Sequence, residues 1–291
     1  MSEKARYDII GHKNLWFAVS GVMLLAGIIS LFVFGLNLGI DFTGGTIYDL
    51  RFPKTVAIDQ IRETLDEQGL KNAVIQKTAE KDIFIRTKIM NKDEQEALVA
   101  KLSQEHGQAE VQRIEMVGPV IGEQLTKQSL LALLIASVGI VIYVSVRFEL
   151  KFAVASILAI LHDVFIVIGI FSILQKEIDV TFVAAILTIV GYSINDTIVI
   201  FDRIRENLRH KSKKESLKDL MNRSIYQSLT RSIYTPLTVL FTLVSLYIFG
   251  GETLSNFTLA MILGVLVGTY SSIFNASPLV ELWTEKIEGK H

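Results

Sequence analysis

The chain of 291 residues contains no cysteine, which excludes disulfide bonds, thiol catalysis and cysteine-ligated metal sites. It also has no cluster of His, Asp and Glu with metal-ligand spacing, and no G-x-x-x-x-G-K-[ST] loop for a nucleotide. We therefore expect no cofactor and no enzymatic activity, so any energy must come from an ion gradient or from a partner. The net charge of −1 is uninformative as a total, and nothing in it indicates a nucleic-acid partner.

Charge is scarce in six apolar runs, each long enough to cross a bilayer. Four of them carry no charge, and the exceptions hold His162 with Asp163 and Asp196. The first run is longer than a signal-peptide core and no A-x-A site follows it, which predicts a retained membrane helix. The runs occupy about residues 15–35, 129–146, 152–174, 179–201, 232–250 and 253–280.

The basic residues of the short loops predict orientation, because cytoplasmic loops are enriched in Lys and Arg. The N-terminal segment, the link after the second run and the segment 202–230 are basic, whereas loops 175–178 and 250–255 are poor in positive charge. Both termini are therefore expected in the cytoplasm of a multi-pass cell-membrane protein. The basic segment either binds anionic lipid head groups or only determines topology. Its residues 215–229 are expected to form an amphipathic helix.

Segment 36–128 is expected outside the membrane, because it has the alternating and helical patterns of an α+β domain. The predicted order is β-α-β-β-α-β, the split βαβ or ferredoxin-like arrangement. The predicted fold class is an α-helical polytopic membrane protein with six transmembrane helices and a small external ferredoxin-like α+β domain. The expected strands are 46–52, 73–78, 82–88 and 109–117, and the expected helices are 57–68 and 93–105.

At the start of the external domain, Gly44 and Gly45 follow Asp41 closely and predict a tight turn that Asp41 could cap.

The patterns divide the chain into five parts. The expected parts are a cytoplasmic N-terminus with the first helix at 1–35, the external domain at 36–128, helices two to four at 129–201, a basic cytoplasmic segment at 202–230, and helices five and six with a cytoplasmic C-terminus at 231–291.

Asp196, beside Asn195, is the only charge in about 20 apolar residues. An ionisable group in a membrane span costs at least a few kcal/mol, so it marks a functional site by default. Arg231 begins the next run, at a compatible depth. A carboxyl group that burial favours as neutral and a nearby arginine favours as charged can exchange a proton. The alternatives are a hydrogen bond between helices and a permanent ion pair that only fixes packing.

Asp163 lies near the middle of its apolar run and must therefore have a partner. It is either a second proton-relay group or a structural hydrogen-bond acceptor. His162 is expected to point to a different helix face and to serve in packing rather than as a ligand. Gly264 and Gly268 form a G-x-x-x-G pattern, which permits close helix packing.

Four motifs together resemble the SecF subunits of SecDF protein-export complexes, in the resistance–nodulation–division superfamily. They are GIDFTGGT at 39–46, LHD at 161–163, GYSINDTIVIFDRIREN at 191–207 and RSIYT at 231–235. The order and spacing agree along essentially the whole chain. The 17-residue motif, which also includes Asp202 and Arg203, is the most specific of the four.

The resemblance implies half of a transporter bundle, completed by six helices of a separate SecD chain. It implies assistance to preprotein translocation through the SecYEG channel, coupled to proton motive force, with Asp196 and Arg231 in the proton pathway. It also implies YajC and YidC as further candidate partners. Two alternatives stay open, a scaffold that only stabilises SecD and the channel, and a half-transporter for proton-driven efflux of small molecules. The sequence leaves the coupling ion open between H⁺ and Na⁺.

Overall fold

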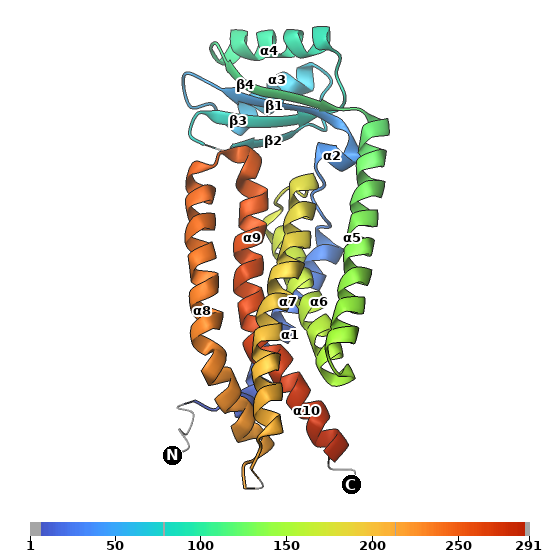
Figure 1. The fold of residues 1–291 in the computed structure, drawn as a ribbon. Helices are drawn as coiled ribbons and strands as arrows, with labels where there is room; N and C mark the ends of the chain where they lie inside the picture. Colours follow the sequence, from blue (N-terminus) through green and yellow to red (C-terminus); the bar gives the residue numbers. More distant parts are fainter. Residues whose placement is uncertain (1–6, 78, 213, 289–291) are drawn as a thin grey trace. The chain divides into compact units, whose positions relative to one another are not determined.

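The computed structural model describes residues 7–77, 79–212 and 214–288 (Figure 1). The chain divides into two compact units, one formed by residues 1–37 with 131–291 and the other by residues 38–130. In the described part of the chain, six helices are long and apolar enough to cross a membrane, in agreement with the predicted fold class. They are α1 (Lys13–Val33), α5 (Pro119–Arg147), α6 (Leu150–Leu174), α7 (Val180–Arg209), α8 (Leu217–Phe249) and α9 (Glu252–Ser271), the last of which continues through η2 (Ser272–Ala276) into α10 (Ser277–Glu288).

The smaller unit has the predicted ferredoxin-like fold. Its four strands form one antiparallel sheet in the order β2-β3-β1-β4, in which Tyr48 of β1 pairs with Ile85 of β3 and with Ile114 of β4. A short helix, α2, precedes the first strand. The elements are α2 (Ile40–Thr43), β1 (Gly45–Arg51), α3 (Ile58–Glu67), β2 (Val74–Lys77), β3 (Asp82–Thr87), α4 (Lys92–His106) and β4 (Glu110–Val117).

The core of this unit lies between the sheet and its two longer helices. Alternate residues of the strands, such as Tyr48 and Ile85, share a buried cluster with Ile61 of α3 and with Leu98 of α4. Because side chains alternate between the two faces of a strand, this cluster uses one face of the sheet. Helix α4 begins with a reciprocal capping box, in which Asn91 and Glu94 each bond the other's backbone N–H. The sequence pattern therefore determines both the helix start and the buried face.

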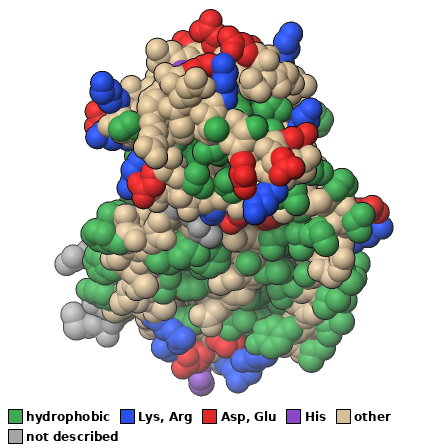
Figure 2. All heavy atoms as spheres, turned by 90° about the horizontal axis from the view of Figure 1, so that it is seen from above, with side chains coloured by type: hydrophobic (Ala, Val, Ile, Leu, Met, Phe, Trp, Pro, Cys, Tyr) green, Lys and Arg blue, Asp and Glu red, His purple; other side chains and the backbone are tan. Residues whose placement is uncertain are grey.

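The helices of the larger unit expose a largely apolar surface. Many large hydrophobic side chains of its helices are exposed, among them Phe32, Val146 and Phe249, each more than 80% exposed. The space-filling view likewise shows wide hydrophobic areas on the face that it draws (Figure 2). A soluble monomer rarely exposes so much contiguous apolar surface, which agrees with helices that lie in lipid.

Helices α5, α7 and α8 are longer than the apolar runs predict, and α5 begins at Pro119, about ten residues before its run. The expected amphipathic helix at 215–229 and the fifth run form one continuous helix, α8, and α7 extends to Arg209. No Gly or Pro interrupts the chain between these parts, and Pro236 lies inside α8. Met221 and Ile225 pack in the main core of the unit, so tertiary packing extends the helix beyond its apolar run. Proline inside a helix is tolerated more readily in membrane proteins.

A hydrogen-bonded cluster attaches the N-terminal segment to the start of α8. Asp8 Oδ1 accepts from the Gly11 N–H and from Asn222 Nδ2, both at 2.8 Å, and Asp8 Oδ2 lies 2.5 Å from Lys218 Nζ. Burial raises the pKa of Asp8, but these donors outweigh it and hold that pKa below its usual value. The cluster therefore stabilises the fold above the usual pKa of an aspartate, and this contribution is lost as the pH falls.

Helices α1 and α6 approach each other at two glycines. A Cβ atom on Gly27 would lie 3.0 Å from the Gly169 Cα atom, and one on Gly169 would lie 2.6 Å from the Gly27 Cα atom. One turn further along, Ser30 and Ser172 share a hydrogen bond of 2.8 Å. Small residues and interhelical hydrogen bonds are the usual basis of helix association in membranes. The hydropathy pattern gave no indication of this contact.

We predict that Gly169→Ala destabilises the helical unit by about 1–3 kcal/mol, because the added methyl group meets the backbone of α1. Gly21→Ala in α1 is the matched control, since nothing lies within 4 Å of its added Cβ. The control should leave stability unchanged or raise it by up to about 1 kcal/mol. Thermal unfolding of the purified variants in detergent measures the difference. Equal midpoints for the two variants would contradict the close contact.

Candidate functional site

Helix α7 carries the residues of the 17-residue motif. It starts where Asp179 caps it, since the Asp179 carboxylate accepts a 2.8 Å hydrogen bond from the Phe182 N–H. Asp196 lies more than halfway along this helix with 6% of its surface exposed, whereas the neighbouring Asn195 is exposed. Successive residues of a helix point about 100° apart, so these two side chains serve different surroundings.

Asp196 lies against the start of the membrane part of α8. Two side chains of α8, Ser232 and Arg231, lie close enough to interact electrostatically with the Asp196 carboxylate. Among the described residues, Asp196 makes no direct ion pair with Arg231, whose side chain is exposed. Asp196 Oδ2, Ser232 Oγ and Tyr192 Oη are buried and make no hydrogen bond of good geometry in the described part of the chain, although Ser232 lies close to the Asp196 carboxylate. Buried polar atoms are normally paired, so three unpaired ones around one carboxylate single out this place among the described residues.

Asp163 has a complete set of partners. Its Oδ2 atom accepts hydrogen bonds from Ser193 Oγ of α7 at 2.5 Å and from Ser271 Oγ of α9 at 2.9 Å. Its Oδ1 atom lies 2.9 Å from Nδ1 of His162. The carboxylate is 1% exposed, and a buried charge of this kind is stable only when it is paired and hydrogen-bonded. Asp163 thus joins three helices, α6, α7 and α9.

His162 continues this network, although the sequence pattern predicts a packing role for it. Its Nε2 atom lies 3.1 Å from Asn275 Nδ2, which also donates to Ser20 Oγ of α1 at 2.8 Å. The tautomer in which Nε2 accepts from the Asn275 amide places a proton on Nδ1, where it can donate to Asp163. The His162 ring also stacks against the Tyr270 ring at a centroid distance of 6.4 Å. The side-chain conformation, which helix periodicity does not predict, brings His162 to Asp163.

The polar residues of the last span meet at a π-helical segment, η2. Within it, Ser272 Oγ lies 2.8 Å from Thr197 Oγ1 of α7, and Asn275 reaches His162. Just before it, the G-x-x-x-G pattern packs against α7, because a Cβ on Gly264 would lie 2.3 Å from Ile189 and one on Gly268 would lie 3.1 Å from Ser193. Short π-helical segments inside long helices occur frequently at functional sites.

The other motif residues lie outside this network. Asp202 Oδ2 pairs with Arg147 of α5 at 3.1 Å, and Arg203 pairs with Glu206 at 2.8 Å. Asp41 lies in α2, which ends at Gly44 with a φ of +70°, followed by Gly45 with a φ of +145°. A Cβ on Gly45 would lie 2.7 Å from the Thr87 carbonyl oxygen, so only glycine fits the turn.

Comparisons with known proteins give the family. Residues 97–286 match the family described as protein export membrane protein SecD/SecF, C-terminal, and residues 29–56 match the SecD/SecF GG motif. The protein translocase subunit SecF of Sebaldella termitidis is 44% identical over 93% of this chain and 89% of its own length. The corresponding subunit of Thermodesulfovibrio yellowstonii is 44% identical over 96% of this chain and 95% of its own length.

Two solved structures of SecDF have the same fold. The crystal structure of SecDF, a translocon-associated membrane protein from Thermus thermophilus, matches with a TM-score of 0.89 and 39% identity over 96% of this chain. A SecDF structure in a super-membrane-facing form matches with a TM-score of 0.72 and 39% identity over 98% of this chain. This chain spans 39% and 40% of those two SecDF chains. These findings define a multi-pass membrane protein of the protein-export class. The chain belongs to the SecF family of protein translocase subunits, as the motifs predicted.

We predict that Asp163→Ala destabilises the bundle more than Asp163→Asn does. Alanine leaves the Ser193 hydroxyl and Nδ1 of His162 without their partner, at a cost of about 1–3 kcal/mol for each group left unsatisfied, whereas the Ser271 hydroxyl can still donate to the Gly268 carbonyl oxygen. Asparagine keeps the shape and an oxygen that can accept. Thermal unfolding of both variants in detergent measures the order, and an alanine variant as stable as the asparagine variant would show that the network contributes little.

Proposed function

We propose that this chain works with a SecD-like partner to assist preprotein translocation through a SecYEG-type channel, using the proton motive force. The observation that supports this best is the incomplete polar site at Asp196, which is buried beside Ser232 and near Arg231. An ionisable group with an unpaired oxygen inside an apolar span is suited to binding and releasing a proton. Asp163 is either a second relay group or a structural acceptor, and its complete hydrogen bonds favour the structural role.

The surface beside Asp196 fits a partner helix. Small or polar residues are exposed along one stripe of α7, where neighbouring helices can approach closely. Arg231 is exposed at the start of the membrane part of α8, where a guanidinium that faces lipid without a counter-group is costly. A SecD-like chain on this face would cover the stripe and supply a counter-group for Arg231. The stripe consists of Ala184, Thr188, Gly191 and Asn195.

The remaining parts of the proposal concern orientation and assembly. The basic residues of segment 202–230 support a cytoplasmic location for that segment and for both termini, with residues 36–128 on the outside. Anionic lipids would then bind the basic segment, and the smaller unit would contact the emerging preprotein. YajC and YidC are candidate partners by resemblance alone. The rival candidates, a scaffold for SecD and a small-molecule efflux half-transporter, are separated by the following experiment.

We predict that Asp196→Asn abolishes the part of preprotein translocation that depends on an imposed pH gradient. Asparagine keeps the size and polarity of the side chain but cannot exchange a proton at neutral pH. The chain is reconstituted with a SecD-like partner and a SecYEG-type channel, and the translocation rate is measured against the gradient.

Two outcomes separate the candidates, and a second variant tests the same site. An unchanged slope with intact assembly would leave the scaffold function. No translocation effect of the wild-type complex, together with proton-driven export of a small molecule, would indicate the efflux function. Arg231→Lys keeps the charge but loses the planar fork that binds a carboxylate at two points, so we expect a partial loss of the slope.

We predict that Gly191→Leu reduces co-purification with the SecD-like partner. Nothing lies within 4 Å of a Cβ placed on Gly191, so the larger side chain disturbs only what packs against the chain from outside. Gly139→Leu is the matched control, because Gly139 is a helical glycine of α5 that is equally open. Pull-down with a tagged chain measures the ratio of the two proteins. Equal partner recovery for both variants would place the SecD contact elsewhere.

A further inference from the structure

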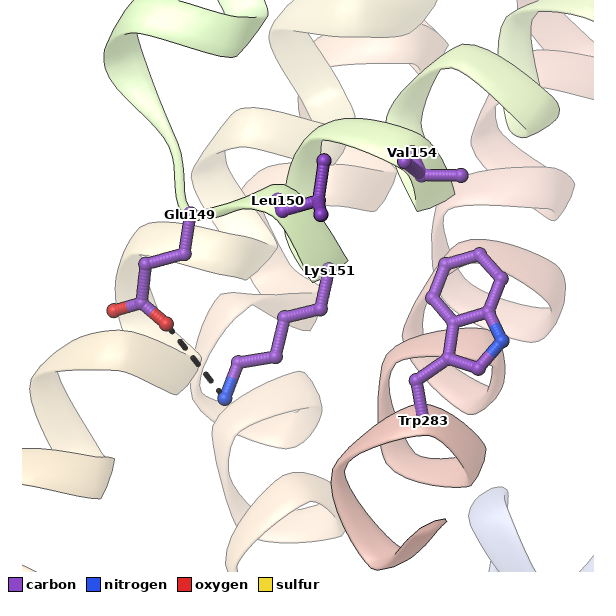
Figure 3. A pocket seen from close by; sticks show the side chains of 5 residues that line it. All are labelled: Glu149, Leu150, Lys151, Val154 and Trp283. Atoms are coloured by element: carbon purple, nitrogen blue, oxygen red, sulfur yellow. Dashed lines mark ion pairs between the residues drawn. The ribbon is translucent and has the colours of Figure 1, made fainter. Parts of the chain in front are cut away.

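A cavity of about 460 Å³ opens at the start of α6, away from the polar site. Figure 3 shows Glu149 and Lys151 on one side of it and the indole ring of Trp283, from α10, on the other. Leu150 and Val154 complete the lining. Its volume lies in the range of sites that bind small molecules. The cavity lies where the link between two candidate spans, α5 and α6, turns into α6.

The lining combines an apolar wall with a charged mouth. Leu150, Val154 and Trp283 are apolar, and Leu150 is 80% exposed. Tryptophan is enriched where the end of a membrane span meets the head groups, and lysine at such a place extends its amine towards water. A ligand for this cavity therefore needs a hydrocarbon part and a charged head group, as a membrane lipid has.

The charges at the mouth have opposite signs and are weakly joined. Lys151 Nζ lies 3.7 Å from Glu149 Oε2, beyond hydrogen-bond distance, and the Glu149 side chain is 64% exposed. Lys151 Nζ also lies 5.5 Å from the centre of the Phe152 ring, which keeps the amine beside the cavity. A long and exposed ion pair contributes little, so a ligand with both charges can replace it at small cost. A purely anionic head group would instead face the Glu149 carboxylate.

We propose that this cavity binds a zwitterionic glycerophospholipid with a primary-ammonium head group, of the phosphatidylethanolamine type. The phosphate pairs with Lys151, and the ammonium group donates hydrogen bonds to Glu149. One acyl chain lies against Leu150, Val154 and Trp283. A choline head group has the same charges but no N–H donor for Glu149, so the site discriminates against it.

The test uses the fluorescence of Trp283. The chain contains two tryptophans, so a Trp16→Phe background leaves Trp283 as the single tryptophan, which can be excited apart from the tyrosines. This full chain is reconstituted in vesicles that contain the same mole fraction of bromine-labelled phosphatidylethanolamine, phosphatidylglycerol or phosphatidylcholine. Bromine on the acyl chain quenches an indole that it contacts. We expect quenching by phosphatidylethanolamine to exceed the other two by about threefold, as the loss of the one weak interaction with Glu149 would give.

Variants of the mouth identify the groups responsible. Glu149→Gln should remove the preference for ethanolamine over choline, and Lys151→Gln should weaken quenching by all phospholipids with a bromine label. Glu206→Gln, on the exposed Arg203–Glu206 pair of α7, is the matched control and should keep the wild-type preference. Circular dichroism checks that each variant is folded.

Three results would overturn the proposal. Equal quenching by the three lipids would show only ordinary boundary lipid at Trp283. A preference for phosphatidylglycerol that survives Glu149→Gln would indicate an anionic-lipid surface instead. Absence of quenching by any lipid would show that the membrane does not reach the cavity, for example because another protein covers it.

Discussion

The burial of the Asp163 carboxylate is the constraint on which the helical unit depends. A charge that is 1% exposed among apolar helices must be surrounded by donors, and here the donors come from three places in the chain. Ser193 and Ser271 can both reach it only if α7 and α9 lie very close together. That closeness in turn requires glycine at positions 264 and 268, where a side chain would collide with α7. The hydrogen bonding of Asp163 thus requires small residues at these two positions of α9.

The two carboxylates in the apolar spans differ in how completely they are hydrogen-bonded. Asp163 has partners for both of its oxygens within the chain, whereas Asp196 has a buried oxygen with no partner in the described residues. When one buried carboxylate is fully hydrogen-bonded and another is not, the first is suited to stabilising the fold and the second to a functional role. In the proposed assembly, Asp163 stabilises the bundle and Asp196 is completed by what binds to the exposed face of α7 and α8.

Much of the fold could be predicted from the sequence, because the signals are local. Runs of apolar residues predict the six spans, and alternation predicts the four-stranded sheet with its two helices. Isolated charges in the apolar runs, or at the start of one, singled out Asp196, Asp163 and Arg231, and the resemblance implied a proton pathway for Asp196 and Arg231. The bonds of Asn275 to His162 and to Ser20 could not be predicted, because they join residues 113 and 255 positions apart. The contact of Gly27 with Gly169 and the full length of α8 depend in the same way on tertiary packing.

Helix α7 connects these observations in the proposed mechanism. Ser193, three residues before Asp196, donates to Asp163 of α6, and Thr197, directly after it, bonds Ser272 in the π-helical segment. A change of charge at Asp196 that shifts or turns α7 must therefore act on both contacts at once. Residues 162 and 163 in turn bond Asn275 and Ser271, so that adjacent side chains of α6 hold both ends of that segment. A movement of α7 would therefore reach this segment through the contacts at both of its ends, and short π-helical segments of this kind occur frequently at functional sites.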